Sequence, residues 1–287
     1  MSSNFEKVFE GYQPIGSLSD IQSKISDILN AHYEKANNKD NIRLLHSFVD
    51  LTSLNSTDSE DSIYNFVKQV NNLDETDPTI PPVAAICVYP NFVRTVKENL
   101  TTEGVSIACV AGGFPSSQTF PEVKMTEAGL ALEDGANEVD IVLLLGEFLS
   151  GNYQEVIDDI KEIRDLCKKE KLKVILETGA LQTPQNIQRA SILSLYAGAD
   201  FIKTSTGKEY PGASLEAAYI MCQVLKTYEQ LSGEKRGLKV SGGIRTAEDA
   251  LKYFCIVKHV LGEEYLTPEY FRIGASSLVN DIYKHLK

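Results

Sequence analysis

The chain has 287 residues, of which 43% are apolar and 24% charged, and its formal net charge is −12. This composition is that of a globular protein and excludes a disordered or membrane-embedded chain. Because Lys and Arg are dispersed through an acidic sequence, we expect no concentrated positive face, and therefore neither a nucleic-acid nor a membrane partner.

The N-terminal segment, residues 1–40, contains an amphipathic helix ahead of the first predicted strand. Its apolar residues recur at helical spacing and are Ile21, Ile25, Ile28 and Leu29. We expect a helical extension packed on a single catalytic barrel domain, residues 41–287, as a cap over its end or as an oligomer contact. The segment has no basic start followed by an apolar run, and no later stretch approaches the roughly 18 apolar residues that cross a bilayer, so we expect a cytoplasmic protein.

Short runs rich in Val and Ile alternate with helical patterns along the rest of the chain, which is typical of a parallel sheet. The runs are LLHSFVDLT (44–52), VAAICVY (83–89), VSIACVA (105–111), EVDIVLL (138–144), KVILET (173–178), DFIKTS (200–205), GLKVSG (237–242) and FRIGAS (271–276). Eight strands are the number that closes into a (β/α)8 TIM barrel. The predicted fold class is therefore α/β, with this barrel and an extra N-terminal helical segment.

Helical spacing between the strands supports the same fold. The apolar residues of two segments fall on one face each and are Val156, Ile160, Ile163 and Cys167, and Ile187, Ala190, Leu193 and Ala197. Gly135 and Gly198 stand where helices should end. Polar, proline-containing loops are expected over 71–82 and 261–270.

Three ionisable residues, Asp140, Lys203 and Lys239, stand inside otherwise apolar strands, where a buried charge needs a reason. Each lies near the C-terminal end of its strand, where barrels of this kind carry their functional residues. Strand alternation puts Lys203 and Ser205 on one inward face, and Lys239 and Ser241 repeat that parity. Burial and a second ammonium both disfavour a protonated lysine, so we expect a Schiff-base amine, with Asp140 handling protons. A structural ion pair, such as Lys239 with Asp140, is the alternative.

Glycine- and serine-containing loops follow the last three strands and predict a phosphate site. They are STGK (205–208), SGGIR (241–245) and IGASS (273–277). Glycine lets the backbone approach a ligand, and amides at helix N-termini suit anions. Lys208 and Arg245 add positive charge. Ordinary glycine turns are the alternative for any one of these loops.

The remaining candidates are individual residues. Glu177, at the end of the fifth run, is expected to bind substrate or to pair with a cation. The five cysteines are widely spaced without a CxxC pair, which predicts reduced thiols rather than disulfides or a zinc site, and the four histidines have no metal-ligand spacing. We therefore expect no metal and no cofactor.

Several of these motifs together resemble the deoxyribose-phosphate aldolase family, class I aldolases on a TIM barrel. They are DLTSLN (50–55), ICVYPNF (86–92), EVDIVL (138–143), FIKTSTGK (201–208), LKVSGGIR (238–245) and IGASS (273–277). The resemblance runs from about residue 44 to 284. It implies a metal-independent lyase of deoxyribonucleotide catabolism and carbohydrate degradation. Such an enzyme cleaves 2-deoxy-D-ribose 5-phosphate reversibly to D-glyceraldehyde 3-phosphate and acetaldehyde through a lysine Schiff base.

The resemblance also implies roles for individual residues. Lys203 would be the Schiff-base lysine, Lys239 the second lysine that perturbs it, and Asp140 the proton-relay carboxylate. Residues in or near the substrate pocket would be Asp50, Thr52, Asn55, Cys87 and Thr206. The phosphate would be held by Gly207, Lys208, Gly242, Gly243, Arg245, Gly274, Ser276 and Ser277. Some members end in a tyrosine that assists proton transfer, whereas Tyr283 of this chain falls in its last predicted helix.

Two other functions stay open on the sequence. A phosphosugar isomerase or epimerase on the same barrel would use Asp140 as a base and the lysines as electrostatic stabilisers. A phosphosugar-binding sensor would keep the phosphate loops without turnover. In each case the partner is a small phosphosugar, and homodimer and homotetramer are the assemblies to be tested.

Overall fold

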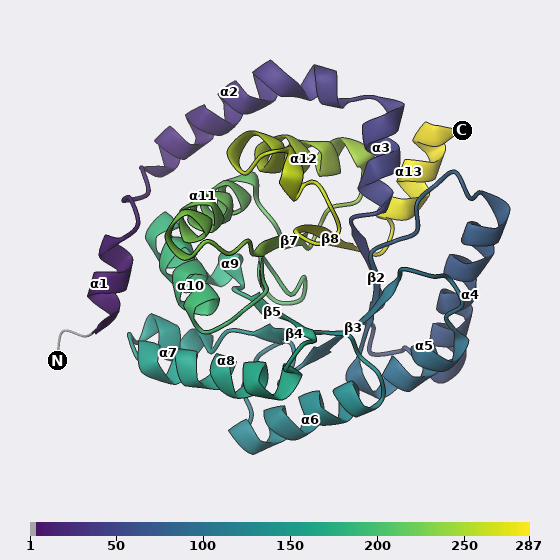
Figure 1. The fold of residues 1–287 in the computed structure, drawn as a ribbon, viewed down its shortest axis with the longest axis horizontal. Coiled ribbons are helices and arrows are strands. Elements are labelled where there is room, and N and C mark those ends of the chain that lie inside the picture. Colours follow the sequence, from purple (N-terminus) through teal and green to yellow (C-terminus); the bar gives the residue numbers. More distant parts are fainter. Residues whose placement is uncertain (1–3) are drawn as a thin grey trace.

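Eight parallel strands form a closed barrel at the centre of the structure, a computed structural model that describes residues 4–287 (Figure 1). Each strand pairs with the next along the chain, and β1 pairs with β8 to close the ring. The strands are β1 (Val49–Thr52), β2 (Ala85–Val88), β3 (Ser106–Ala111), β4 (Glu138–Val142), β5 (Lys171–Ile175), β6 (Phe201–Lys203), β7 (Gly237–Ser241) and β8 (Phe271–Ala275). The predicted (β/α)8 barrel is confirmed.

Helices surround the barrel and cover the outer faces of its strands (Figure 1). They are α1 (Asn4–Glu10), α2 (Leu18–Ala36), α3 (Lys39–His46), α4 (Glu60–Thr76), α5 (Val93–Asn99), α6 (Pro121–Glu133), α7 (Leu145–Leu149), α8 (Tyr153–Cys167), α9 (Thr178–Leu181), α10 (Pro184–Tyr196), α11 (Leu215–Ser232), α12 (Ala247–Val260) and α13 (Leu278–Leu286), with the 3-10 helices η1 (Pro90–Phe92) and η2 (Glu263–Tyr265). Because helices cover the outer faces of the strands and side chains fill the barrel interior, the strands are buried on both faces. This burial explains their continuous apolar sequence.

The predicted helical stripes are buried in α8 and α10, facing the barrel. Helix α10 begins after Thr183, whose hydroxyl accepts a hydrogen bond from the backbone N–H of Asn186. Gly135 and Gly198 follow the ends of α6 and α10 with φ of 109° and 103°, a backbone region that favours glycine. Both predicted helix ends are therefore confirmed.

The loop predicted over 71–82 is wrong in its first half, because α4 continues to Thr76. A capping box at Ser59 starts this helix, and Ile63, Val67 and Val70 bury one side of it. The polar residues after Val70 contain no proline until Pro78, so nothing stops the helix earlier.

The N-terminal segment lies along the outside of the helical ring. Helix α2 packs its buried isoleucines against α11 and α12, as its position beside them in Figure 1 shows. Helix α1 reaches α8 and α10, where the ring of Phe9 meets that of Tyr153 edge-on and lies 5.2 Å from the Arg189 guanidinium. The segment therefore covers helices of the ring, and α3 leads directly into β1.

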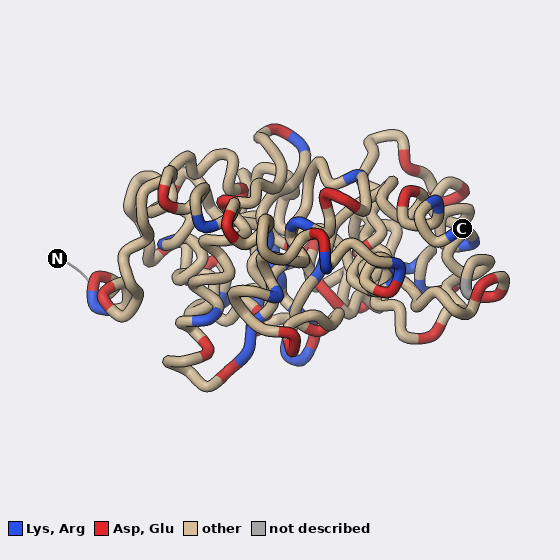
Figure 2. Tube along the Cα trace, turned by 90° about the horizontal axis from the view of Figure 1, so that it is seen from above, with Lys and Arg blue, Asp and Glu red and all other residues tan. Residues whose placement is uncertain are grey.

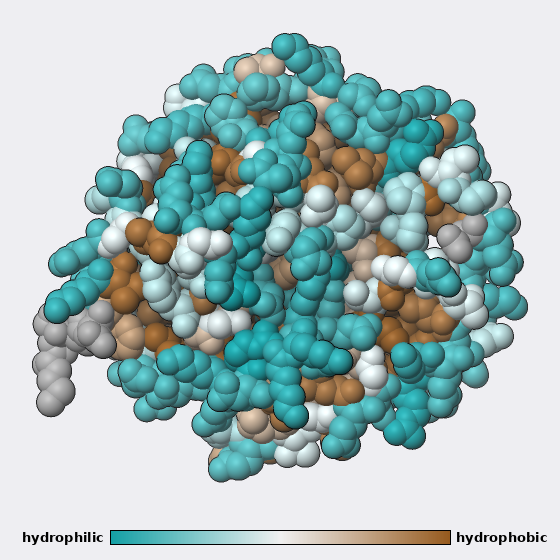
Figure 3. Space-filling view, in the orientation of Figure 1, coloured by the Kyte–Doolittle hydropathy of each residue, from teal (hydrophilic) through white to brown (hydrophobic). Residues whose placement is uncertain are grey.

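The surface is polar and mixed in charge. Acidic and basic residues are interspersed over the molecule rather than gathered on one side (Figure 2). The face shown in Figure 3 is mostly hydrophilic with separate apolar areas. Between residues 4 and 287, no helix is both long and apolar enough to span a bilayer.

Candidate active site

The barrel interior is apolar on one side and ionic on the other. The side of β2 and β3 is filled by small apolar side chains, among them Ala85, Cys87, Ala108 and Val110. The opposite side carries seven ionisable residues from β1, β4, β5, β6, β7 and β8, all buried and in contact with one another. They are Asp50, Glu138, Asp140, Lys173, Lys203, Lys239 and Arg272.

The register of the barrel stacks these ionisable side chains in layers contributed by alternate strands. In the deepest layer, Arg272 of β8 binds Glu138 of β4 at 2.8 Å. The odd-numbered strands contribute the next layer, in which the Nζ of Lys239 of β7 lies 2.6 Å from Asp50 of β1. Asp140 and Lys203 then follow two residues beyond Glu138 and Phe201 on their strands, nearest the mouth of the barrel.

Asp140 is the common partner of three lysines. Its Oδ2 lies 2.8 Å from the Nζ of Lys203 and 2.8 Å from the Nζ of Lys239. Its Oδ1 lies 2.8 Å from the Nζ of Lys173. Although burial would raise its pKa, the three ammonium groups hold the pKa of Asp140 well below its ordinary value.

The two lysines on β6 and β7 are side by side but differ in their partners. Lys239 has a second carboxylate, Asp50, 2.6 Å from its Nζ, whereas Lys203 has Asp140 alone among the residues described. Burial lowers the pKa of Lys203, with Lys239 adding to the effect and Asp140 opposing it. Burial acts on Lys239 as well, but Asp140 and Asp50 outweigh it and raise its pKa. Of the two, Lys203 is therefore the lysine that loses its proton more readily.

Charge counting within the cluster leads to the same residue. Its four cationic side chains face only three carboxylates, and all seven are buried. A buried unbalanced charge is costly, and the cheapest correction is the loss of one proton from the least stabilised ammonium. Loss of that proton from Lys203 leaves three cations with three anions.

A cavity of about 300 Å³ opens at the mouth of the barrel, with Lys203 on its wall. The loops after β6, β7 and β8 form much of its lining, together with Thr52 at the end of β1 and Asn55 in the loop that follows. The backbone carbonyl of Leu54 accepts a hydrogen bond from the ammonium of Lys208, which joins the β1 and β6 loops across this mouth. An amine that can lose its proton thus faces a cavity rimmed by glycines, hydroxyls and two cations, Lys208 and Arg245.

Residues 45–281 match the model of the family described as DeoC/LacD family aldolase. The chain belongs to this aldolase family. It is an enzyme of the lyase class, and the match spans the whole barrel, from the end of α3 into α13.

Individual relatives agree with this assignment. A Caenorhabditis elegans protein with the provisional name deoxyribose-phosphate aldolase is 42% identical over 251 residues, which cover 87% of this chain and 82% of that one. The human deoxyribose-phosphate aldolase is 42% identical over 205 residues, 71% of this chain and 64% of its own length. Among solved structures, the tetrameric deoxyribose phosphate aldolase of Aeropyrum pernix is 26% identical with a TM-score of 0.68, covering 95% of this chain and 100% of that chain.

The structure brings most of the predicted site residues to one place. Eleven of the predicted substrate and phosphate residues line the mouth cavity beside Lys203: Thr52, Asn55, Thr206, Gly207, Lys208, Gly242, Gly243, Arg245, Gly274, Ser276 and Ser277. Asp50 and Cys87 lie deeper. Asp50 is fully buried between Lys239 and Arg272, and Cys87 belongs to the apolar side of the barrel interior.

Sequence reasoning missed three members of the ionic cluster, Glu138, Lys173 and Arg272. Each is a charged residue in a buried strand, with exposed fractions of 1%, 0% and 2%. The signal that could have found them is the same as for Asp140, Lys203 and Lys239, a charge inside an apolar strand. These three stand nearer the start of their strands, away from the end where function is expected.

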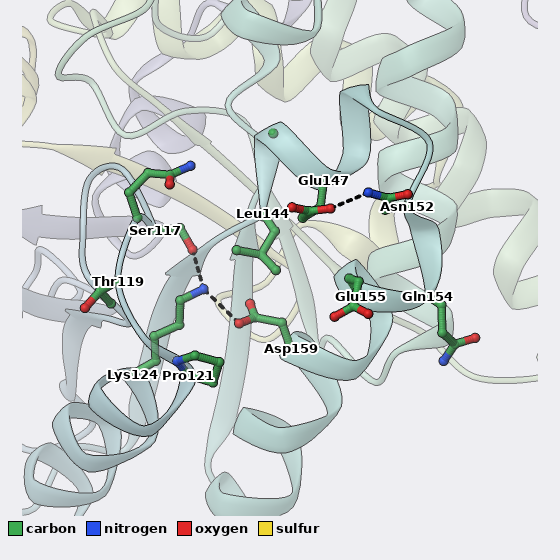
Figure 4. A pocket seen from close by; sticks show the side chains of 12 residues that line it. Ser117, Thr119, Pro121, Lys124, Leu144, Glu147, Asn152, Gln154, Glu155 and Asp159 are labelled. Atoms are coloured by element: carbon green, nitrogen blue, oxygen red, sulfur yellow. Dashed lines mark hydrogen bonds and ion pairs between the residues drawn. The ribbon is translucent and has the colours of Figure 1, made fainter.

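A second, larger cavity of about 640 Å³ lies outside the barrel mouth, between the loop before α6, helix α7 and helix α8. Lys124 on its wall is buried and contacts Ser117 Oγ and Asp159 Oδ1, both at 2.8 Å (Figure 4). In this cavity Lys124 is paired with the carboxylate of Asp159. The side-chain amide of Asn152 donates a hydrogen bond to the carboxylate of Glu147. The arrangement ties the β3 loop to α6 and α8.

Within residues 4–287, no group of three or more His, Cys, Asp or Glu side chains is placed to hold a metal ion. The five cysteines are all buried and unpaired. Burial raises the pKa of Cys87, so its thiol stays protonated at neutral pH.

Proposed function

We propose that this aldolase cleaves 2-deoxy-D-ribose 5-phosphate reversibly to D-glyceraldehyde 3-phosphate and acetaldehyde. The observation that carries the proposal is the buried amine of Lys203, whose pKa is lowered and which opens onto the mouth cavity. The names of the nematode, human and Aeropyrum relatives support the choice of substrate. A cavity of about 300 Å³ suits a five-carbon phosphosugar.

In this proposal, the neutral amine of Lys203 attacks the aldehyde carbon of the open-chain sugar, and loss of water gives an iminium. The bond between the second and third carbons then breaks, and its electron pair moves into the iminium to form an enamine. Asp140, acting through a water, takes the hydroxyl proton at the third carbon, which leaves as the aldehyde of glyceraldehyde 3-phosphate. Protonation of the enamine and hydrolysis release acetaldehyde and restore the amine.

The remaining residues prepare the amine and position the substrate. Lys239 keeps Lys203 partly neutral by its charge. The loops after β6, β7 and β8 would hold the phosphate with their backbone amides and hydroxyls, with Lys208 and Arg245 adding charge. Fixing the far end of the sugar places its aldehyde at Lys203, a positioning effect worth several kcal/mol of the barrier.

The test is intact-mass spectrometry after borohydride reduction with acetaldehyde or deoxyribose 5-phosphate, followed by peptide mapping. We expect a reduced adduct on the peptide that contains Lys203. No adduct, or an adduct elsewhere, in a protein shown separately to bind the sugar would contradict the proposal. That outcome would favour an isomerase with Asp140 as base, or a phosphosugar sensor.

We further propose a metal-independent, cytoplasmic enzyme with no nucleic-acid or membrane partner, and a homo-oligomer, dimer or tetramer. The tetrameric relative from Aeropyrum pernix supports the last point. Turnover unchanged by a chelator, and a light-scattering mass of two or four chains, are the expected results. We also propose that residues 1–40 form an extension and that residues 41–287 form a single catalytic barrel domain.

A further inference from the structure

Glu177 lies at the turn after β5, as the residue before α9, and its side chain is neither exposed nor part of the ionic cluster. Its exposed fraction is 2%. Its backbone has φ 52° and ψ 60°, the left-handed conformation that residues other than glycine rarely adopt. Such strain persists only where the surroundings hold the residue in place, and it is concentrated at functional sites.

Both carboxylate oxygens of Glu177 accept hydrogen bonds from one residue, Thr206, which lines the mouth cavity. The backbone N–H of Thr206 donates to Oε1 at 3.2 Å, and its hydroxyl donates to Oε2 at 2.5 Å. The same hydroxyl accepts a hydrogen bond from the backbone N–H of Lys208 at 3.2 Å. The carboxylate therefore sets the conformation of the segment Thr206–Gly207–Lys208 through a chain of three hydrogen bonds.

The backbone around Glu177 explains how the side chain reaches this loop. Leu176 donates to the carbonyl of Lys203, and Thr178 donates to the carbonyl of the next residue, Thr204. Two residues that are two positions apart on the β5 side therefore pair with two consecutive residues on the β6 side. Glu177, which lies between them, is the extra residue of a β-bulge. Its carboxylate, rather than a backbone carbonyl, then receives the N–H of Thr206.

Close backbone contacts hold the same loop from both sides. A Cβ on Gly179 would lie 2.7 Å from the carbonyl oxygen of Pro211, so the turn after β5 packs directly on the loop. A Cβ on Gly212 would lie 2.2 Å from the carbonyl oxygen of Gly242 on the β7 loop. The β6 loop is therefore clamped between two glycine contacts, and Glu177 supplies the directional hydrogen bonds.

Neither function expected for Glu177 from the sequence matches this geometry. Glu177 is absent from the lining of the mouth cavity, and within residues 4–287 its carboxylate forms no ion pair at 4.0 Å or less with a Lys or Arg. Burial raises its pKa, against the two hydrogen bonds from Thr206. The carboxylate thus acts on the cavity through Thr206.

We propose that Glu177 is a positioning residue that gives the enzyme its preference for a phosphorylated substrate, by holding Thr206, Gly207 and Lys208 at the barrel mouth. This inference rests on the proposed function. A phosphorylated sugar must meet this loop with its far end, whereas the reaction at the aldehyde requires only Lys203 and its ionic partners. Loss of the carboxylate should therefore weaken binding of the phosphate ester and leave binding and turnover of the unphosphorylated sugar unchanged.

The experiment compares Glu177→Gly and Glu177→Gln in the full chain, with 2-deoxyribose 5-phosphate and 2-deoxyribose as substrates. Glycine adopts the left-handed conformation without strain, so this substitution removes the carboxylate without a backbone penalty. We expect Glu177→Gly to raise KM for the phosphate ester about tenfold, the effect of losing a charge-assisted hydrogen bond, with kcat changed by less than about twofold. Glu177→Gln, which keeps one acceptor for the N–H of Thr206, should restore part of the affinity.

Gln182→Ala is the matched control, because Gln182 also has a positive φ of 62°, ends the same α9 turn and is exposed. Its KM values should not change. Equal losses with both substrates in Glu177→Gly, or an unchanged KM for the phosphate ester, would overturn the inference. A lower kcat with a shifted pH profile would overturn it as well, since it would make Glu177 a proton-transfer group. Borohydride trapping on the unsubstituted chain separates the two proposals: without an adduct on Lys203 the proposed function fails, whereas an adduct with unchanged KM values removes only the role of Glu177.

Discussion

Lys203 and Lys239 sit in neighbouring layers of the same barrel, and the comparison of the two layers shows how one lysine of a buried pair becomes reactive. Both Nζ atoms lie 2.8 Å from the same oxygen of Asp140, and both side chains are buried. The layer of Lys239 contains a second carboxylate, Asp50, and the layer of Lys203 does not. The pKa of Lys239 is raised and that of Lys203 is lowered.

Burial by itself therefore does not make a nucleophile. Desolvation acts on both lysines, and the number of carboxylates within contact decides which of them keeps its proton. The cluster as a whole is one anion short, and Lys203, which contacts a single carboxylate among the residues described, is the cation that faces the cavity. The following substitutions test this difference.

Lys203→Arg should have the largest effect, because guanidinium cannot form the imine. We expect a loss of turnover of at least about 10³-fold and no borohydride adduct. Measurement of kcat and of intact mass after reduction would check both. Residual turnover within tenfold of the unsubstituted enzyme would show that the mouth layer does not carry the nucleophile.

Lys239→Leu should have the next largest effect, with kcat reduced by about 10²-fold. Removing this ammonium takes away a charge that lowers the Lys203 pKa and leaves Asp140 to stabilise the Lys203 ammonium, so the pKa of Lys203 should rise. Since the neutral amine reacts, adduct formation should then move to higher pH. The rate of borohydride trapping as a function of pH measures this shift, and an unchanged profile would contradict the role of the deeper layer.

Asp50→Asn should shift the same profile in the opposite direction. Without the Asp50 charge, the cluster becomes more positive and the Lys203 pKa should fall, so trapping extends to lower pH. The substitution also leaves Arg272 and Lys239 with fewer partners, and the free energy of unfolding should drop by about 3–5 kcal/mol. Opposite pH shifts in Asp50→Asn and Lys239→Leu would establish that charge balance, rather than packing, sets the reactivity of Lys203.

Lys124→Met should have the smallest effect on catalysis, because this buried lysine belongs to the outer cavity and is paired with Asp159. We expect kcat and KM within about twofold of the unsubstituted enzyme. Asp159 would lose its partner, so the free energy of unfolding should fall by about 1–3 kcal/mol. Chemical denaturation and steady-state kinetics on one preparation would check this. A large loss of turnover would mean that the two cavities are coupled.

The sequence predicted the barrel because short, continuously apolar runs recur eight times with helical patterns between them, and both patterns are local. It also predicted Lys203, Lys239 and Asp140, because a charge inside an apolar strand near its C-terminal end is visible without coordinates. It failed at α4, where the polar residues before Pro78 favour a loop although no residue there ends the helix. It also passed over Lys173, Glu138 and Arg272, which carry the same kind of signal at the other end of the strands.

What the sequence determined by itself is the fold, the shared inward face of Lys203 and Lys239 and the residue types available for the chemistry, because these depend on spacing along the chain. What only the tertiary structure decided is which charges meet. Asp50 and Lys239 are 189 positions apart in the sequence, yet they contact each other because the stagger of the closed barrel stacks side chains of alternate strands in layers. The count of carboxylates around each lysine, and the reach of Glu177 across to Thr206, follow from that stacking and from one bulge, and no local pattern encodes either.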